Sequence, residues 1–455
     1  MRIPNIRRAV SLLALVVFSL STDSGADSIN RPPKFDYTMT TLANGLKVVM
    51  LEDHSTPIVH AEIWYHVGSK NEKPGRTGFA HLFEHMMFKG SKNVEPEGHP
   101  SWISSVGGQS NATTDEDRTL YWQTFPAQYL PLVLWLEADR MATLRIDEAV
   151  FKNEREVVKE ERRMRVDNQP YGRLNEIVYD QAFTVHPYKH PTIGSMADLE
   201  AASINDVRDF FKTFYVPNNA TLVLVGDFDS KEALKLVEQY LGRVPAGKPV
   251  PRDIPKEPEQ TKERRVRLEE NWPLPAVVVA HHITYDGHPD AYPLHIASKV
   301  LSDGQSSRIY RKLVYESRIA LAAFGGGNII EHPNLFFAVA IVQPGKTPEE
   351  AANALIAELD RLRKEPITAA ELQQAKNQFA RDYIFSRESN RDKAGQLGHA
   401  AVIHNDIKTA DGEFDIFMNI SQADVQRVAQ TYFTPENRLV LTIMPKGGGS
   451  GGEEQ

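Results

Sequence analysis

The sequence predicts an α+β protein of two similar domains, each a mostly antiparallel sheet packed with helices, joined by a proline-rich linker. Three observations lead to this prediction: a segment repeated near the end of each half, a linker-like run between the halves, and strand-like runs that precede helix-like runs. The expected domains are residues 27–245 and 263–446. Residues 246–262 would form the linker, and 447–455 a flexible tail.

The repeat consists of SINDVRDFFKTFYVPNNATLVLV, beginning at Ser203, and SQADVQRVAQTYFTPENRLVLTI, beginning at Ser421. The offset of 218 residues (421 − 203) holds without a gap. Each segment predicts a helix capped by its serine, a turn at Pro-x-Asn, and a strand such as residues 221–225. We therefore expect one domain to be used twice.

Local patterns predict the elements around these repeats. Residues 45–51 and 58–67 are typical of strands, and residues 78–89 of a helix. Between the halves, residues 242–263 contain five prolines and several charges without an apolar period. This composition favours an extended linker.

The first 26 residues resemble a secretory signal peptide. Three arginines precede an apolar run from Ala9 to Leu20, and small residues end the segment at Ala26. The run is shorter than the ~20 residues that span a bilayer, so we expect cleavage after Ala26, with an uncleaved anchor as the alternative. A periplasmic (or secreted) protein follows from this prediction, with no stable membrane span after cleavage.

Composition narrows the class of protein further. With 41% hydrophobic and 25% charged residues, neither disorder nor a polytopic membrane protein is expected. The net charge is −8 and no long Lys/Arg run is present, so nucleic acid is not an expected partner. Because the chain has no cysteine, a thiol peptidase is excluded, and a zinc site must use histidine and carboxylate ligands.

The run GRTGFAHLFEHMMFKG carries the predicted chemistry. On a helix, His81 and His85 share a face, so both imidazoles can bind one zinc ion at about 2.0–2.1 Å. Glu84 lies on the same side and can accept a proton from an acidified water. A histidine pair alone is more often surface decoration, but the complete H-x-x-E-H is a known catalytic motif, the inverse of H-E-x-x-H.

The third ligand is expected on the acidic helix that starts at Asp147. Glu154 and Glu161 are seven residues apart and share a face, whereas Glu160 points about 100° away. We assign Glu161 as the ligand and Glu154 as a carboxylate that orients a ligand. Taken alone, this charged helix would be interpreted as a solvated surface.

At these residues the chain resembles the pitrilysin family of inverted-motif zinc peptidases, which includes insulysin and the mitochondrial processing peptidase. The resemblance covers essentially the whole chain after Ala26, and it looks like that of a short bacterial-type member. It rests on G-x-T-G-x-A-H-L-F-E-H-M at 75–86, the EREVVKEE stretch at 154–161, Gly107-Gly108 with the following Asn111-Ala112, and HPYKHPTIG at 186–194. The 76 residues between His85 and Glu161 are similar to the family spacing.

The resemblance implies a half-molecule of two α+β domains that pairs with a second half, hence a dimer. It also implies that Asn111 and Ala112 lie on an edge strand to which an extended peptide adds. Without the metal motif, residues 107–111 would be interpreted as a hairpin turn.

One departure from the family concerns its S-S-R-L-Y-R-x-L-R-x-x-x-G-L-A-Y stretch, whose later Arg and Tyr reach substrate. Here Val314 stands at the Arg position and Leu321 at the Tyr position, and Tyr315 and Arg318 are out of register unless the helix slips. The hypothesis is that a related chain supplies this pair in a heterodimer. A homodimer would then retain weak activity, because loss of such stabilisation costs ~10²–10³ in rate.

The predicted function is zinc-dependent hydrolysis of peptides or small unfolded polypeptides, with Glu84 as proton acceptor. A non-catalytic structural or chaperone-like subunit of the same fold is the alternative. A third interpretation, zinc storage or sensing, would need neither Glu84 nor an edge strand.

Overall fold

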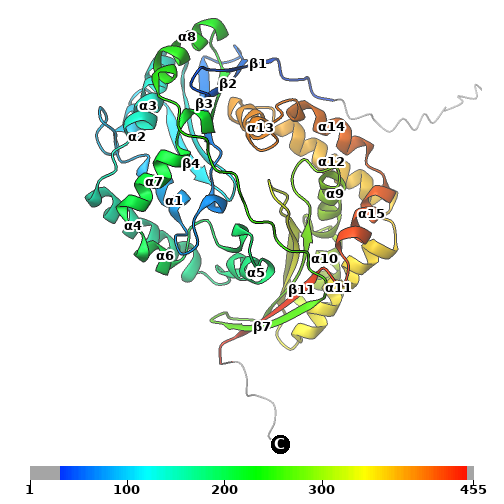
Figure 1. Cartoon of the computed structure of the whole chain (residues 1–455). Coiled ribbons are helices and arrows are strands. Elements are labelled where there is room, and N and C mark those ends of the chain that lie inside the picture. The colour runs from blue at the N-terminus through cyan, green and yellow to red at the C-terminus, as the bar shows by residue number, and fades with distance from the viewer. Residues whose placement is uncertain (1–30, 448–455) are drawn as a thin grey trace, which may run out of the picture. The chain divides into compact units, whose positions relative to one another are not determined.

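Two β-sheets organise the protein in the computed structural model, which describes residues 31–447 (Figure 1). The predicted signal peptide and the residues after 447 lie outside the described part. Within the described part, residues from Lys34 onward belong to a single unit by their contacts. Among residues 31–447, no helix is both long and apolar enough to cross a membrane.

The first sheet has six strands in the order β1-β2-β6-β3-β5-β4. The strands β2 and β6 are parallel, and the other neighbours are antiparallel. Two of them confirm the expected strands at 45–51 and 58–67, with slightly different ends. The bounds are β1 Tyr37–Thr41, β2 Lys47–Glu52, β3 Ile58–Tyr65, β4 Gln109–Thr114, β5 Thr119–Pro126 and β6 Ala220–Gly226.

The second sheet has five strands in the order β7-β11-β8-β10-β9. Without β1, the first sheet has the corresponding order, and in both sheets the same neighbouring pair is parallel. This common topology confirms the predicted α+β fold of two similar halves, while the predicted domain boundaries stay a prediction. The bounds are β7 Arg264–Glu270, β8 Ala276–Ile283, β9 Ala320–Gly327, β10 Asn334–Val342 and β11 Arg438–Pro445.

Helices cover the faces of both sheets. Ser203 and Ser421 each form a capping box at the start of α7 and α15, as the repeat predicts. In the first half the helices are α1 Phe79–Met86, α2 Gly98–Ser105, α3 Leu130–Thr143, α4 Glu148–Arg162, α5 Leu174–Ala182, α6 Met196–Ala201, α7 Ile204–Phe214 and α8 Ser230–Tyr240. In the second half they are α9 Ala291–Ser302, α10 Arg308–Tyr310, α11 Pro348–Lys364, α12 Ala369–Phe385, α13 Asn390–Val402, α14 Thr409–Asn419 and α15 Gln422–Tyr432.

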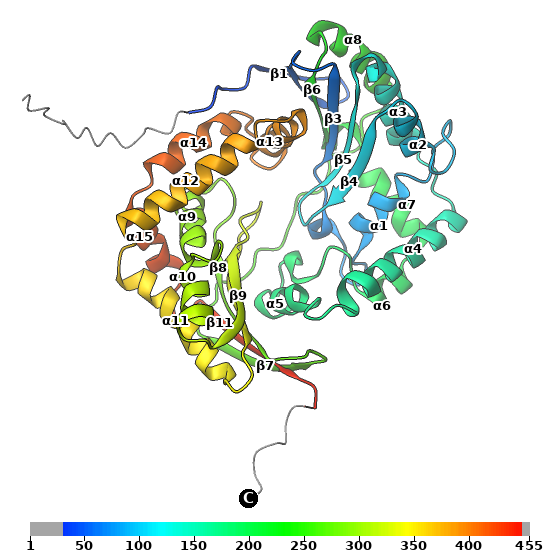
Figure 2. The ribbon, with the colours of Figure 1, turned by 180° about the vertical axis from the view of Figure 1, so that it is seen from behind.

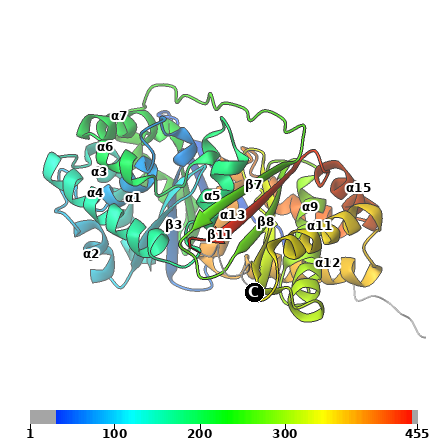
Figure 3. The same cartoon turned by 90° about the horizontal axis from the view of Figure 1, so that it is seen from below.

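The two halves exchange one helix each, which the sequence does not predict. Helix α13 belongs to the second half by sequence but packs on β3 and β6 of the first sheet (Figure 2). Helix α5 belongs to the first half but packs on β8 and shares an apolar core with the second sheet (Figure 3). The repeat offset of 218 residues places α5 within α13, so equivalent helices are exchanged. Each half therefore needs the other to bury one face of its sheet.

The contact between α13 and the first sheet leads to a prediction about stability. A Cβ atom added at Gly398 would lie 2.3 Å from atoms of the Trp64 indole, whose Nε1 donates a 2.6 Å hydrogen bond to Glu62 Oε2. Gly398→Ala is expected to lower the free energy of unfolding by about 1–3 kcal/mol, because the ring or the helix must move. Urea denaturation measures this change.

Gly395 provides the matched control, because it lies on the same helix with nothing within 4 Å of an added Cβ. Gly395→Ala is expected to stabilise the protein by roughly 0.5–1 kcal/mol through helix propensity. Equal stability of the two alanine variants would contradict the packing of α13 on Trp64.

Candidate metal centre

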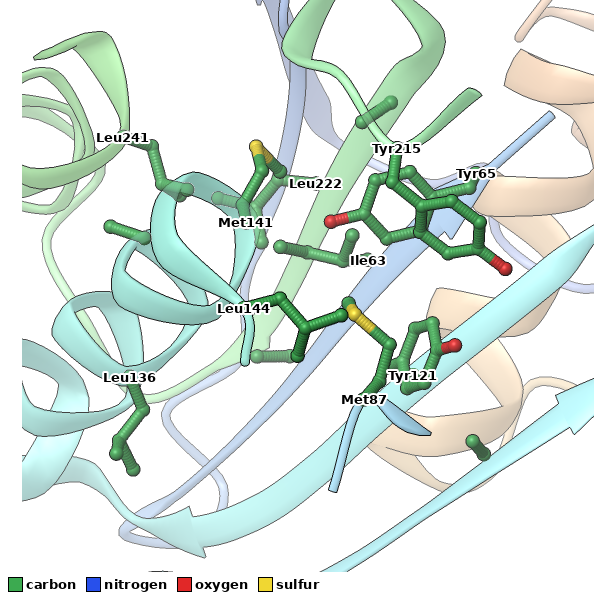
Figure 4. Packing of buried hydrophobic residues seen from close by; sticks show 14 of the residues in the cluster. Ile63, Tyr65, Met87, Tyr121, Leu136, Met141, Leu144, Tyr215, Leu222 and Leu241 are labelled. Carbon is green, nitrogen blue, oxygen red and sulfur yellow. The ribbon is translucent and has the colours of Figure 1, made fainter. Parts of the chain in front are cut away.

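Helix α1 presents its two histidines on the side opposite the core of the first half. Phe83 and Met86 on α1 are buried, and the Phe83 ring lies 4.2 Å from the ring of Tyr215, centroid to centroid. Figure 4 shows this core, in which Tyr65, Tyr121 and Tyr215 surround the segment that follows α1. Because that face is buried, His81 and His85 point away from the core, as their spacing predicts.

Glu161, near the end of α4, meets both histidines. Its Oε2 atom lies 3.2 Å from Nε2 of His81 and 3.2 Å from Nε2 of His85. The donor atoms of the three residues all lie within 4.8 Å of one another. Ligands at 2.0–2.1 Å in a tetrahedral zinc site stand about 3.3 Å apart, so the donor set and its spacing fit zinc.

Glu84 lies beside this cluster and is held by a residue of β4. The Thr114 hydroxyl donates a 2.5 Å hydrogen bond to Glu84 Oε2, which is also 3.7 Å from Nδ1 of His81. The carboxylate is therefore oriented next to the three candidate ligands without being one of them. Such a carboxylate can hold a proton taken from a nearby water.

Glu154 is 1% exposed and lies on the His85 side of the cluster. Its Oε2 is 3.8 Å from Nδ1 of His85, while its Oε1 accepts a 2.8 Å hydrogen bond from Asn153 and lies 3.3 Å from Nζ of Lys89. A carboxylate near the outer imidazole nitrogen favours the tautomer that leaves Nε2 free to bind a metal. Glu160 instead pairs with Arg163 at the surface.

The cluster is strongly coupled electrostatically. Burial alone would lower the pKa of His81, but its contacts with Glu161 and Glu84 outweigh burial and raise that pKa to about 9. Hydrogen bonds with His81 and then His85 lower the pKa of Glu161. Two imidazoles and a carboxylate in this arrangement attract positive charge, which a metal cation can supply.

A buried carboxylate that the sequence analysis missed supports the start of α1. Glu72 accepts backbone hydrogen bonds from Gly78 at 2.9 Å and Ala80 at 2.7 Å, in the place of an N-cap side chain. Gly78 has φ 92°, and its close approach to the 193–194 backbone would be blocked by a Cβ atom. An acid six residues before the glycine could have been recognised as a capping candidate, but nothing local indicates its burial.

Asn111 and Ala112 lie on β4, which is the edge strand of the first sheet. The strand begins after the turn at Gly107, so residues 107–111 do not form the hairpin turn that was the alternative. The N–H of Ala112 donates to Asn111 Oδ1 at 2.9 Å. Helix α1 contacts this strand, so the candidate centre is next to a free sheet edge.

The second half carries a different cluster at the equivalent helices. His295 and Lys299 are four residues apart on α9, as His81 and His85 are on α1, and Nζ of Lys299 lies 2.9 Å from Asp382 on α12. Burial and the neighbouring Lys299 charge lower the pKa of His295 to about 4. An ammonium group therefore occupies the place where the first half offers a second imidazole.

The segment that departs from the family pattern winds as a π-helix at Arg311–Glu316. A π turn displaces side chains from their α-helical positions, which is the kind of slip that Tyr315 and Arg318 would require. Tyr315 is exposed, and Leu321 on β9 is 50% exposed. Arg318 has φ 50°, in the left-handed region.

Comparisons with known proteins agree with this architecture. Residues 47–196 match the family model described as insulinase (peptidase family M16), and residues 201–379 match the one described as peptidase M16 inactive domain. The chain is 31% identical to the zinc protease PqqE of Helicobacter pylori over 97% of this chain and 99% of that one.

Two further similarities are more distant or structural. The mitochondrial-processing peptidase subunit beta of Lentinula edodes is 23% identical over 87% of each chain. The crystal structure of a protease from Helicobacter pylori superposes with a TM-score of 0.86 at 31% identity, covering 90% of this chain and all of that one.

Proposed function

The chain belongs to the insulinase family of peptidases, family M16, and on this premise we propose that it is a zinc-dependent endopeptidase for peptides and small unfolded polypeptides. The observation that carries the proposal is the position of Glu161 Oε2, 3.2 Å from Nε2 of both histidines. His81, His85 and Glu161 would hold the zinc ion. When bound, zinc polarises the peptide carbonyl and lowers the pKa of water.

The proton transfers fall to Glu84 in this proposal. Its Oε2 atom takes the proton of the attacking water and returns it to the nitrogen of the leaving amine. The hydrogen bond from Thr114 keeps the carboxylate in place for both transfers. Glu154 keeps the His85 imidazole oriented.

The substrate would bind as an additional strand on the free edge of β4. An edge strand presents unpaired backbone groups, so an extended peptide of loose sequence preference can add to it. The Ala112 N–H, now bonded to Asn111 Oδ1, would donate to a substrate carbonyl instead. Residues Asn111 and Ala112 are therefore the proposed substrate contacts.

We further propose that a related subunit completes the site. Val314 and Leu321 stand where the family pattern has Arg and Tyr, and neither side chain can donate a hydrogen bond to a developing oxyanion. A heterodimer whose second chain supplies the Arg/Tyr pair would solve this, whereas a homodimer would act slowly. The alternative role is a non-catalytic subunit of the same fold, and the match of residues 201–379 to an inactive-domain model keeps it in view. We place the mature chain in the periplasm, on the predicted signal peptide.

Cleavage of a mixed library of unstructured peptides tests these proposals. The zinc-loaded mature chain alone is expected to turn over slowly, and a related chain with the Arg/Tyr pair is expected to raise the rate ~10²–10³-fold. Equal rates with and without the partner would refute the heterodimer. Stoichiometric zinc with no turnover in either sample would favour the non-catalytic alternative.

A further inference from the structure

A second group of metal-binding side chains lies outside the candidate centre. Asp286 follows β8, His399 lies on α13, and His404 follows α13. Their donor atoms lie within 4.8 Å of one another. A single oxygen, Asp286 Oδ2, is 2.7 Å from Nε2 of His399 and 3.0 Å from Nε2 of His404. The arrangement repeats that of Glu161 with its two histidines.

The tautomer of His404 follows from its hydrogen bonds. The Thr409 hydroxyl donates to the Asp406 carbonyl at 2.8 Å, so at its 2.7 Å contact with Nδ1 of His404 it must accept. A neutral His404 then carries its proton on Nδ1, and the lone pair on Nε2 faces the Asp286 carboxylate. An imidazole fixed in this way is prepared to bind a metal.

The Nε2 atom of His404 is also unpartnered. The His404 side chain is 5% exposed, and although Nε2 is 3.0 Å from Asp286 Oδ2, the contact lacks hydrogen-bond geometry. A buried nitrogen that faces a carboxylate without a proton between them is unfavourable. A cation between the two atoms would satisfy both.

The surrounding charge also favours a cation. Burial and then the negative charge of Asp286 raise the pKa of Glu413, so a second acidic group stands near the cluster. Burial alone would raise the pKa of Asp286, but the two histidines lower it, which keeps this carboxylate charged. His399, His404 and Glu413 line a cavity of about 470 Å³, through which an ion can reach them.

We propose that Asp286, His399 and His404 form a second site, which binds a divalent cation of the zinc class. Two imidazoles and a carboxylate suit zinc and neighbouring transition metals better than calcium or magnesium. Bonds of 2.0–2.1 Å require the two nitrogen–oxygen distances to widen by roughly a few tenths of an ångström. His399 is 44% exposed, so its ring can make this movement.

The place of the site indicates a structural role. Helix α13 covers the first sheet, while the Asp286 N–H is anchored to Ile330 in the second half at 2.7 Å. A cation bound by Asp286, His399 and His404 links the end of α13 to the loop after β8. It therefore stabilises the exchange of helices between the halves.

Cobalt(II) titration of the metal-free mature chain, followed by visible absorption and equilibrium dialysis, tests the proposal. We expect two equivalents for the wild type, one for His85→Ala, one for His399→Ala, and none for the double variant. Removal of His399 should weaken the second site by more than the ~10–100-fold typical of outer-shell changes. His54→Ala, which changes an exposed histidine between Glu52 and Asp227, should retain two.

Thermal unfolding provides an independent measurement. In the His85→Ala background, added cobalt or zinc should raise the Tm, and this rise should be lost when His399→Gln is added. Binding of a single equivalent by the wild type, or a Tm rise that persists without His399, would overturn the second site. In that case the cluster is a protonated His–Asp ion pair. Peptide hydrolysis is not used, so failure here is separate from failure of the proposed activity.

Discussion

Glu84→Gln is expected to reduce peptide hydrolysis by ~10²–10⁴-fold while leaving the zinc content unchanged. The amide cannot take a proton from water at neutral pH, so the step assigned to Oε2 is lost. Glutamine keeps the size of the side chain and an oxygen that can accept the hydrogen bond from Thr114. The fold and the three candidate ligands are therefore expected to persist, and only kcat should fall substantially.

The measurement is turnover of the peptide library by zinc-loaded protein, with metal content and Tm determined on the same samples. Glu95→Gln is a suitable control, because its side chain is 87% exposed and its nearest basic group, on Arg145, is 3.9 Å away. Full activity of Glu84→Gln would remove Glu84 from the proton-transfer role. Loss of zinc from this variant would instead make Glu84 a ligand.

Glu161→Gln is expected to weaken zinc binding by more than the ~10–100-fold seen for outer-shell changes, because it removes the charged ligand. Glu160→Gln should bind zinc like the wild type, since Glu160 faces solvent and pairs with Arg163. The two substitutions are chemically identical and adjacent. Any difference between them therefore measures position on the helix.

Competition with a zinc chelator measures the two affinities, and histidine NMR provides a second readout on the metal-free proteins. Glu161 contributes to raising the pKa of His81 to about 9, so Glu161→Gln should bring this pKa down. Similar zinc affinities for Glu160→Gln and Glu161→Gln would contradict the assigned ligand. Activity should follow zinc occupancy in the Glu161 variant, in contrast to Glu84→Gln.

The centre is confined to one half although both halves have the same sheet topology. The equivalent helices of the second half offer His295, Lys299 and Asp382, and the Lys299–Asp382 pair at 2.9 Å provides its own positive charge. A repeat can therefore preserve a fold while losing a metal site, because the fold depends on the apolar pattern and the site on a few polar residues.

Local sequence patterns were sufficient to predict the fold class, the repeat and the arrangement of the candidate ligands on their helices. The spacing of His81 and His85 and the seven-residue separation of Glu154 and Glu161 are consequences of helical periodicity. Serine caps and Pro-x-Asn turns likewise act within a few residues. Such features can be recognised from the sequence because the interactions that produce them are local.

Tertiary structure alone decided the remaining features. The exchange of α5 and α13, the burial of Glu72 under α1 and the contact of Thr114 with Glu84 join residues from separate elements. The cluster of Asp286, His399 and His404 combines residues more than 100 positions apart. No local periodicity encodes these contacts, because they depend on which apolar faces pack together once both sheets have formed.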